Sequence, residues 1–164
     1  MLFNSGIFII IFLPITLVGY FLLAGRGLRV ASIAWLLLTS LFFYGYWKPV
    51  YLILLLASIL GNYYFGTAIS NSPQGSKQAK LLLSCGIAMN LASIAYYKYA
   101  GFFVKSVNSL FQLDLPIPQI ILPLAISFYT FTQIAYLVDT YRQETQKYDL
   151  FRYGLFVTFF PQLI

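Results

Sequence analysis

Three polar side chains follow one another at steps of three residues, Ser127, Thr130 and Gln133, within an uncharged and largely apolar stretch. On an α-helix each step of three turns back by about 60°, so the three side chains share an arc of roughly 120°. Side chains in such an arc either line a tunnel or hydrogen-bond to a neighbouring helix. We favour the second interpretation, in which each interhelical bond contributes about 0.6 kcal/mol.

A short charged group comes directly after this stretch and consists of Asp139, Arg142 and Glu144. An ion pair at a membrane surface is solvated and therefore adds little to stability. We interpret these residues as solvated or structural.

The sequence lacks the residue types from which most catalytic sites are built. It has no histidine, a single cysteine, Cys85, and four acidic residues that are dispersed along the chain. Histidine-based triads and clustered metal ligands are therefore excluded, and the glycines form no phosphate-binding loop. We predict no catalytic residue, no metal site and no cofactor within these residues. Cys85 lies in an apolar run and is expected to be a buried small residue.

The elements that must position Ser127, Thr130 and Gln133 are membrane helices. Hydrophobic residues make up 60% of the chain and charged residues only 9%. Backbone polar groups in hydrocarbon have to be satisfied internally, which favours helices. We therefore predict an all-α, polytopic transmembrane bundle of five to six spans. The ten Lys and Arg residues stand beside apolar runs and are interpreted as topology signals, so we expect no nucleic-acid partner.

The apolar runs and turn formers divide the chain into expected segments. The runs are 2–24, 30–46, 50–69 and 81–97, a segment from 114 to 139, and a last run from about 150. Pro116, Pro118 and Pro123 predict an extended entry into the fifth segment, followed by a helix. Residues 102–105 are amphipathic and are expected near the membrane interface.

The distribution of basic residues predicts the orientation of the chain. If every run spans once, seven Lys and Arg residues fall in the loops after the first, third and fifth spans, against three in the other loops. The basic loops face the cytoplasm, which predicts an N-terminus outside. If the proline-rich segment is re-entrant, the count becomes four against six.

Residues 122–131 and 133–142 resemble the membrane-bound O-acyltransferase superfamily, with the closest match in its alginate O-acetyltransferase branch. Residues 40–47, 96–99 and 159–164 agree in the same order, so the resemblance covers nearly the whole chain. Ala125 is a departure, because many members have glycine there. The resemblance gives Pro123, Asp139, Tyr141 and Arg142 the role of a structural motif.

The resemblance implies that residues 1–164 are the N-terminal part of a single, longer membrane domain. In this family the later helices carry a histidine regarded as the catalytic base, and this chain has none, so we expect no catalysis from it alone. The whole protein would transfer acetyl groups to hydroxyls of alginate or another exopolysaccharide. It would use an acyl donor or acyl-carrier partner and lie in the bacterial inner membrane.

Two other interpretations remain open. The absence of histidine and the proline-broken segment are also compatible with a non-catalytic, transporter-like or partner-binding subunit. Alternatively, the chain is an inert piece of a larger bundle.

Overall fold

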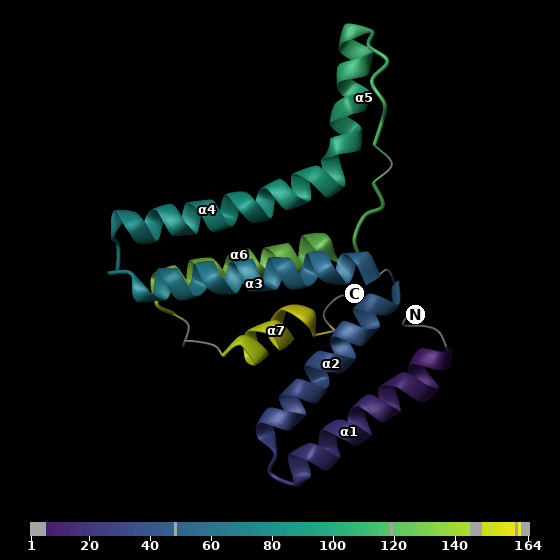
Figure 1. Cartoon of the computed structure of the whole chain (residues 1–164), viewed down its shortest axis with the longest axis vertical. Coiled ribbons are helices and arrows are strands. Elements are labelled where there is room, and N and C mark those ends of the chain that lie inside the picture. The colour runs from purple at the N-terminus through teal and green to yellow at the C-terminus, as the bar shows by residue number, and fades with distance from the viewer. Residues whose placement is uncertain (1–5, 48, 119, 145–148, 160, 162–164) are drawn as a thin grey trace. The chain divides into compact units, whose positions relative to one another are not determined.

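The computed structural model describes residues 6–47, 49–118, 120–144, 149–159 and 161. The α-helices are α1 (Leu13–Gly25), α2 (Arg29–Trp47), α3 (Pro49–Asn71), α4 (Lys77–Ile94), α5 (Ala100–Phe111), α6 (Ile126–Arg142) and α7 (Leu150–Thr158), and the π-helices are η1 (Phe8–Phe12) and η2 (Ala95–Tyr99). No strand occurs in the described ranges. The predicted all-α fold class is confirmed (Figure 1).

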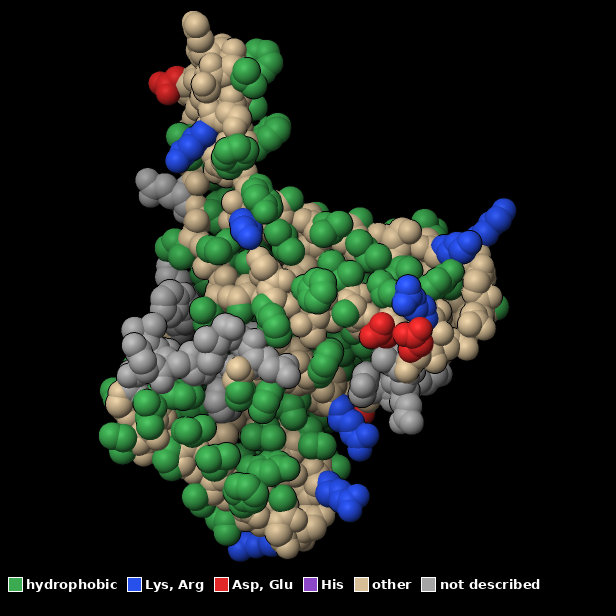
Figure 2. Space-filling model, turned by 180° about the vertical axis from the view of Figure 1, so that it is seen from behind, with side chains coloured by type: hydrophobic (Ala, Val, Ile, Leu, Met, Phe, Trp, Pro, Cys, Tyr) green, Lys and Arg blue, Asp and Glu red, His purple; other side chains and the backbone are tan. Residues whose placement is uncertain are grey.

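Four candidate membrane spans lie in the described residues: Phe8–Gly25, Arg29–Tyr46, Pro49–Asn71 and Lys77–Phe111. They match the first four predicted apolar runs. The fifth expected span corresponds to α6, whose 17 residues lie at the short end of the range of about 17 to 25 that crosses a bilayer. Figure 2 shows hydrophobic side chains over much of the visible surface, with Lys and Arg side chains standing singly or in small groups.

Internal contacts divide the chain into two compact units, and α3 contributes to both of them. The first unit comprises Met1–Tyr63 and Gln146–Ile164, and the second comprises Tyr64–Thr145.

The first unit is built around a helical hairpin of α1 and α2, with α7 packed against α2 (Figure 1). The indole Nε1 of Trp35 donates a hydrogen bond of 3.1 Å to the Thr16 carbonyl oxygen. The Trp35 ring lies directly over Gly19, where an added Cβ would come within 2.5 Å of ring atoms. A glycine facing an aromatic ring therefore allows the two helices to approach closely.

The turn of this hairpin ends α1 with a left-handed glycine. Gly27 has φ +75° and its N–H bonds to the Ala24 carbonyl, while the Leu28 N–H reaches back to the Leu23 carbonyl. This pair of bonds is the Schellman arrangement that satisfies the last carbonyls of a helix. The turn lies between the first two predicted apolar runs, 2–24 and 30–46.

The second unit pairs α4 with α6, and the two helices run in opposite directions. A Cβ at Gly86 in α4 would come within 2.7 Å of Leu137 in α6. In the turn that precedes α4, Gln74 and Gly75 share a surface hollow with Arg142, the last residue of α6. The C-terminal end of α6 therefore lies beside the beginning of α4, so α6 returns along α4.

The segment between α5 and α6 has no regular secondary structure from residue 113 to residue 118 or from 120 to 123. The three prolines of this region remove backbone donors and disfavour helix. The predicted extended entry followed by a helix is therefore confirmed.

Cys85 is exposed, so the prediction of a buried cysteine is wrong. Apolar side chains in a membrane helix face lipid as readily as protein, and for that reason hydrophobicity does not predict burial there. Of the predicted closing stretch, residues 160 and 162–164 lie outside the described residues, as do Lys48 and Lys147.

Candidate functional site

One face of α6 is buried along most of its length and is largely polar. Its buried residues are Ile126, Tyr129, Thr130, Gln133, Tyr136 and Leu137. Their spacing of three and four residues places them on a single stripe of the helix. Hydroxyl and carboxamide groups in this stripe are costly to bury unless they bond to protein or to a ligand.

The structure brings together two of the three side chains that the sequence singled out. Thr130 is 1% exposed and Gln133 is completely buried. Ser127 is exposed. The three side chains span an arc of roughly 120°, which is as wide as the face that a helix presents to its neighbours. Ser127 stands at one edge of this arc and can therefore lie outside the buried face.

The Thr130 hydroxyl differs from the other threonine hydroxyls of α6. The hydroxyls of Thr132 and Thr140 donate to the carbonyl oxygens one turn earlier, Phe128 and Tyr136, at 3.0 and 2.7 Å. The Thr130 hydroxyl is buried and has no hydrogen-bond partner among the described residues. Leaving such a group unsatisfied costs about 1 to 3 kcal/mol.

Sequence reasoning missed Asn90 of α4, which is 2% exposed. Its Nδ2 donates to the Gly86 carbonyl oxygen at 2.8 Å. Gly86 packs against Leu137, so the antiparallel pairing places Asn90 one turn further along, at the level of Gln133. A lone asparagine within an apolar span is the signal that could have identified it.

Sequence reasoning also missed Tyr136, whose ring lies on Gly66 of α3. A Cβ at Gly66 would come within 2.5 Å of the ring and 2.6 Å of the phenol oxygen. Small residues within predicted spans are typical of close helix contacts, and Gly66 and Gly86 both show that pattern.

Pro123 and Ala125 form the start of α6. Pro123 is buried, and its carbonyl accepts the Ile126 N–H at 3.4 Å. Ala125 has φ +54°, a left-handed conformation that costs a non-glycine residue about 1 to 2 kcal/mol. The glycine that many members of the resembled family have at this position would adopt this conformation without that penalty.

Asp139, Tyr141 and Arg142 form the end of α6. The Asp139 carbonyl accepts the Glu144 N–H at 3.0 Å, and Gln143 has φ +58°, which together close the helix in a Schellman arrangement. Tyr141 and Arg142 line the hollow of about 440 Å³ with Gln74, Gly75 and Glu144. The predicted structural motif thus lies at the two ends of α6, with the polar stripe between them.

The described part of the chain contains no group of three or more His, Cys, Asp or Glu side chains that could hold a metal ion. The stripe itself is uncharged. Its neutral donors and acceptors can orient a polar ligand by hydrogen bonding.

Comparison with curated proteins supports a membrane acetyltransferase relationship. The chain is 37% identical to a peptidoglycan O-acetyltransferase of Helicobacter pylori, 36% identical to a probable alginate O-acetylase of Pseudomonas putida and 34% identical to that of Pseudomonas aeruginosa. Each match covers all of this chain but only 36%, 34% and 32% of the respective relative. The chain therefore spans about a third of the length of these relatives.

These relatives confirm the predicted resemblance to membrane-bound O-acyltransferases of the O-acetyltransferase type. No family model matches the chain, and no solved structure matches it.

Proposed function

We propose that this chain is the N-terminal portion of a membrane-bound enzyme that O-acetylates a cell-envelope polysaccharide, with alginate and peptidoglycan as the candidate acceptors. The observation that carries the proposal is the match of the whole chain, at 34 to 37% identity, to acetyltransferases named for these two polymers. In such a reaction the acetyl carbonyl carbon leaves its donor and bonds to an acceptor hydroxyl oxygen. The hydroxyl proton passes to a general base and from there to the departing donor group.

The role proposed for the chain is to line the path of the reacting groups. Thr130 carries a buried hydroxyl, and Gln133 a buried carboxamide, on the same stripe of α6. Ser127 is a third lining candidate one step earlier, on the exposed side of the helix. The chain contains no histidine, so these groups would orient a donor or acceptor rather than remove its proton.

The remaining parts of the proposal concern place and partners. The acyl donor is a small molecule or an acyl-carrier partner. The protein lies in the bacterial inner membrane with its N-terminus outside. The antiparallel pairing of α4 and α6 supports a fifth crossing of the membrane by α6. With five crossings, seven Lys and Arg residues lie in the loops on the cytoplasmic side and three in the loops on the other side, which favours an N-terminus outside.

A chimera tests the proposed function. The segment of the Pseudomonas putida alginate O-acetylase that matches this chain is replaced by the chain itself, and O-acetylation of alginate is measured in cells that lack the native gene. A second chimera uses the Helicobacter pylori relative and measures peptidoglycan O-acetylation. We expect at least one chimera to restore acetylation, and the acceptor that is modified identifies the polymer that this segment accommodates.

Matched variants test which residues of α6 line the path of the reacting groups. In the active chimera, Gln133→Leu and Thr130→Val should lower acetylation about 10-fold or more, whereas Thr132→Val should leave it unchanged. If both chimeras reach the membrane at the native level and neither acetylates its polymer, the proposed function is wrong. Solute flux through vesicles that contain the chain alone would then favour the transporter-like alternative.

A further inference from the structure

Lys77–Phe111 form one apolar helical run that is too long for a single crossing. The run has 35 residues. At about 1.5 Å per residue it would measure roughly 50 Å, whereas the hydrocarbon core is about 30 Å thick. The 18 residues of α4 alone measure about 27 Å, close to this thickness and within the range of about 17 to 25 residues that spans a bilayer. The remaining residues, in η2 and α5, must be placed elsewhere.

The run bends at η2. Figure 1 shows α5 leaving α4 at a steep angle, and η2 is the π-helical turn between them. A π-bulge is one of the few recognised causes of a sharp kink in a helix. The bend therefore lies at the point where α4 reaches the length needed to cross the bilayer.

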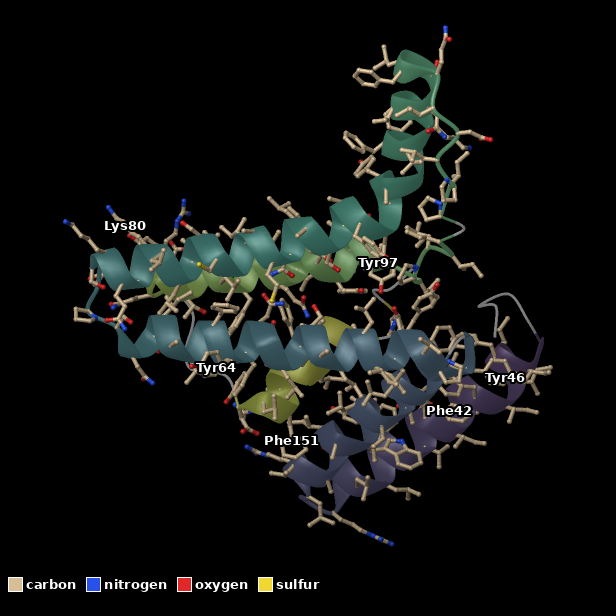
Figure 3. All side chains as sticks on the ribbon, turned by 45° about the horizontal axis from the view of Figure 1, so that its top comes forward. Phe42, Tyr46, Tyr64, Lys80, Tyr97 and Phe151 are labelled. Atoms are coloured by element: carbon tan, nitrogen blue, oxygen red, sulfur yellow. The ribbon has the colours of Figure 1, made fainter. Side chains whose placement is uncertain are left out.

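The bend consists of residue types that favour the boundary between membrane and water. Its residues are Ala95, Tyr96, Tyr97, Lys98 and Tyr99, and the Lys98 ammonium lies 5.7 Å from the centre of the Tyr99 ring. Tyrosine and lysine favour the headgroup level, where an aromatic body meets lipid and a polar tip meets water. Lys80 and Tyr97 lie near opposite ends of the α4–η2 rod (Figure 3), so each marks a different leaflet.

Beyond the bend, α5 is amphipathic. At 100° per residue, Phe103, Val107, Leu110 and Phe111 share an arc of about 100°, while Phe102 lies outside it. Phe103, Leu110 and Phe111 are 67%, 78% and 69% exposed. In Figure 2 most hydrophobic side chains of this projecting part lie along one edge, away from its charged side chains.

The other side of α5 is covered by the chain that follows it. The Asn108 carboxamide donates to the Leu115 carbonyl at 2.9 Å and accepts the Leu115 N–H at 3.1 Å. Gly101, on the same side, lies beside the Pro118 carbonyl. The extended segment thus packs against the polar side of α5 and leaves the apolar arc uncovered.

The extended segment itself belongs outside hydrocarbon. Irregular backbone at membrane depth is tolerated only when it is buried in protein or faces water. Leu113, Leu115 and Ile117 are 45 to 49% exposed, so the described chain does not bury this segment. Since the segment is bonded to α5, both must lie at the same boundary.

We infer that α5 is an interfacial helix that binds the headgroup–acyl boundary of one leaflet with its Phe103–Leu110–Phe111 arc, while the segment after it lies on the water side. The partner is the lipid surface, entered to a depth of about 5 to 10 Å. The inference rests on helix length, the bend and the packing of Asn108, and it holds whether or not the protein is an acetyltransferase.

Spin-label accessibility tests this placement. The only cysteine, Cys85, is replaced by serine, and single cysteines are introduced into the complete protein in phosphatidylethanolamine–phosphatidylglycerol vesicles. Phe103→Cys and Leu110→Cys probe the apolar arc, and Lys105→Cys and Ser109→Cys are matched controls on the polar side. We expect oxygen to relax the labels at 103 and 110 more strongly than a nickel chelate does, and the reverse at 105 and 109.

The membrane depth of the labels distinguishes an interfacial α5 from an α5 that crosses the bilayer. Labels at 103 and 110 should lie at equal depth if α5 is in the membrane plane. They should differ by about 10 Å if α5 continues across the bilayer, which would overturn the inference. Nickel access at all four positions, or exclusion of both reagents at 103 and 110 by covering protein, would also overturn it. Phe103→Trp and Leu110→Trp, quenched by lipids brominated at known depths, repeat the measurement without a spin label.

Discussion

The ring of Tyr136 in α6 rests on Gly66 of α3, so closely that a Cβ at position 66 would come within 2.5 Å of the ring. We expect Gly66→Ala to destabilise the protein by about 1 to 3 kcal/mol, because an added methyl group has no space unless the ring moves. Thermal unfolding in detergent measures the effect. Gly25→Ala is the control, since no atom beyond its chain neighbours and the adjacent backbone of its own helix lies within 4 Å of the added Cβ there.

The same contact predicts energetic coupling. Tyr136→Leu removes the ring that the new methyl group would meet. The double variant should therefore lose less stability than the sum of the two single variants. Strict additivity would contradict the packing of Tyr136 on Gly66.

The Thr130→Val variant tests whether the Thr130 hydroxyl stabilises the fold or serves the reaction. The Thr130 hydroxyl is buried without a partner among the described residues, so its removal should leave stability unchanged or raise it by up to about 2 kcal/mol. Acetylation by the active chimera should nevertheless fall. A loss of stability of 1 kcal/mol or more would instead indicate an interhelical hydrogen bond, the interpretation favoured from the sequence.

Ala125→Gly should stabilise the protein by about 0.5 to 1 kcal/mol. The variant relieves the left-handed strain at φ +54°, and part of that gain is offset by the greater freedom of glycine in the unfolded chain. Ala135→Gly, within the regular part of the same helix, should cost about 1 kcal/mol. Opposite shifts of the melting temperature for the two alanines would support the conformation found at the start of α6.

Trp35→Phe should destabilise the hairpin of α1 and α2 by about 1 kcal/mol. The variant keeps an aromatic ring over Gly19 but removes the hydrogen bond from Nε1 to the Thr16 carbonyl. The melting temperature measures the loss. An unchanged value would show that this bond adds nothing to the packing of the ring on the glycine.

Cysteine labelling tests the proposed orientation. In a Cys85→Ser background, a membrane-impermeant maleimide should label Asp114→Cys in intact cells and spare Gln74→Cys until the cells are opened. The two positions lie at opposite ends of the α4–η2–α5 run, one before α4 and one after α5. The reverse pattern would place the N-terminus inside.

The sequence was sufficient to predict where the helices lie but not which face of each helix is buried. Hydropathy and turn formers located the first four spans, the Gly27 turn and the extended entry to α6. Apolarity distinguishes membrane from water but not protein from lipid, which explains why Cys85 was expected to be buried and is exposed.

The polar stripe was only partly predictable for a related reason. Thr130 and Gln133 could be recognised because they follow each other on one helix. Asn90 and Gly66 approach α6 from helices distant in sequence, so no periodicity within α6 reveals them. The left-handed conformation of Ala125 likewise could not be predicted from the residue type, because alanine favours the right-handed region.

The five-residue π-turn Ala95–Tyr99 also fixes how the chain tolerates changes of length. A π-turn holds one residue more than the α-turn that it replaces, and it is the natural product of a single-residue insertion into a helix. Deleting one residue there would return the turn to the α-helical pitch and remove the cause of the kink, so that α5 would continue along the axis of α4. Phe103 and Leu110 would then lie on a helix directed across the bilayer and not along its surface, although no side chain in α5 had been altered. The number of residues in this turn therefore helps to determine the direction of α5, in addition to the amino-acid composition of α5 itself.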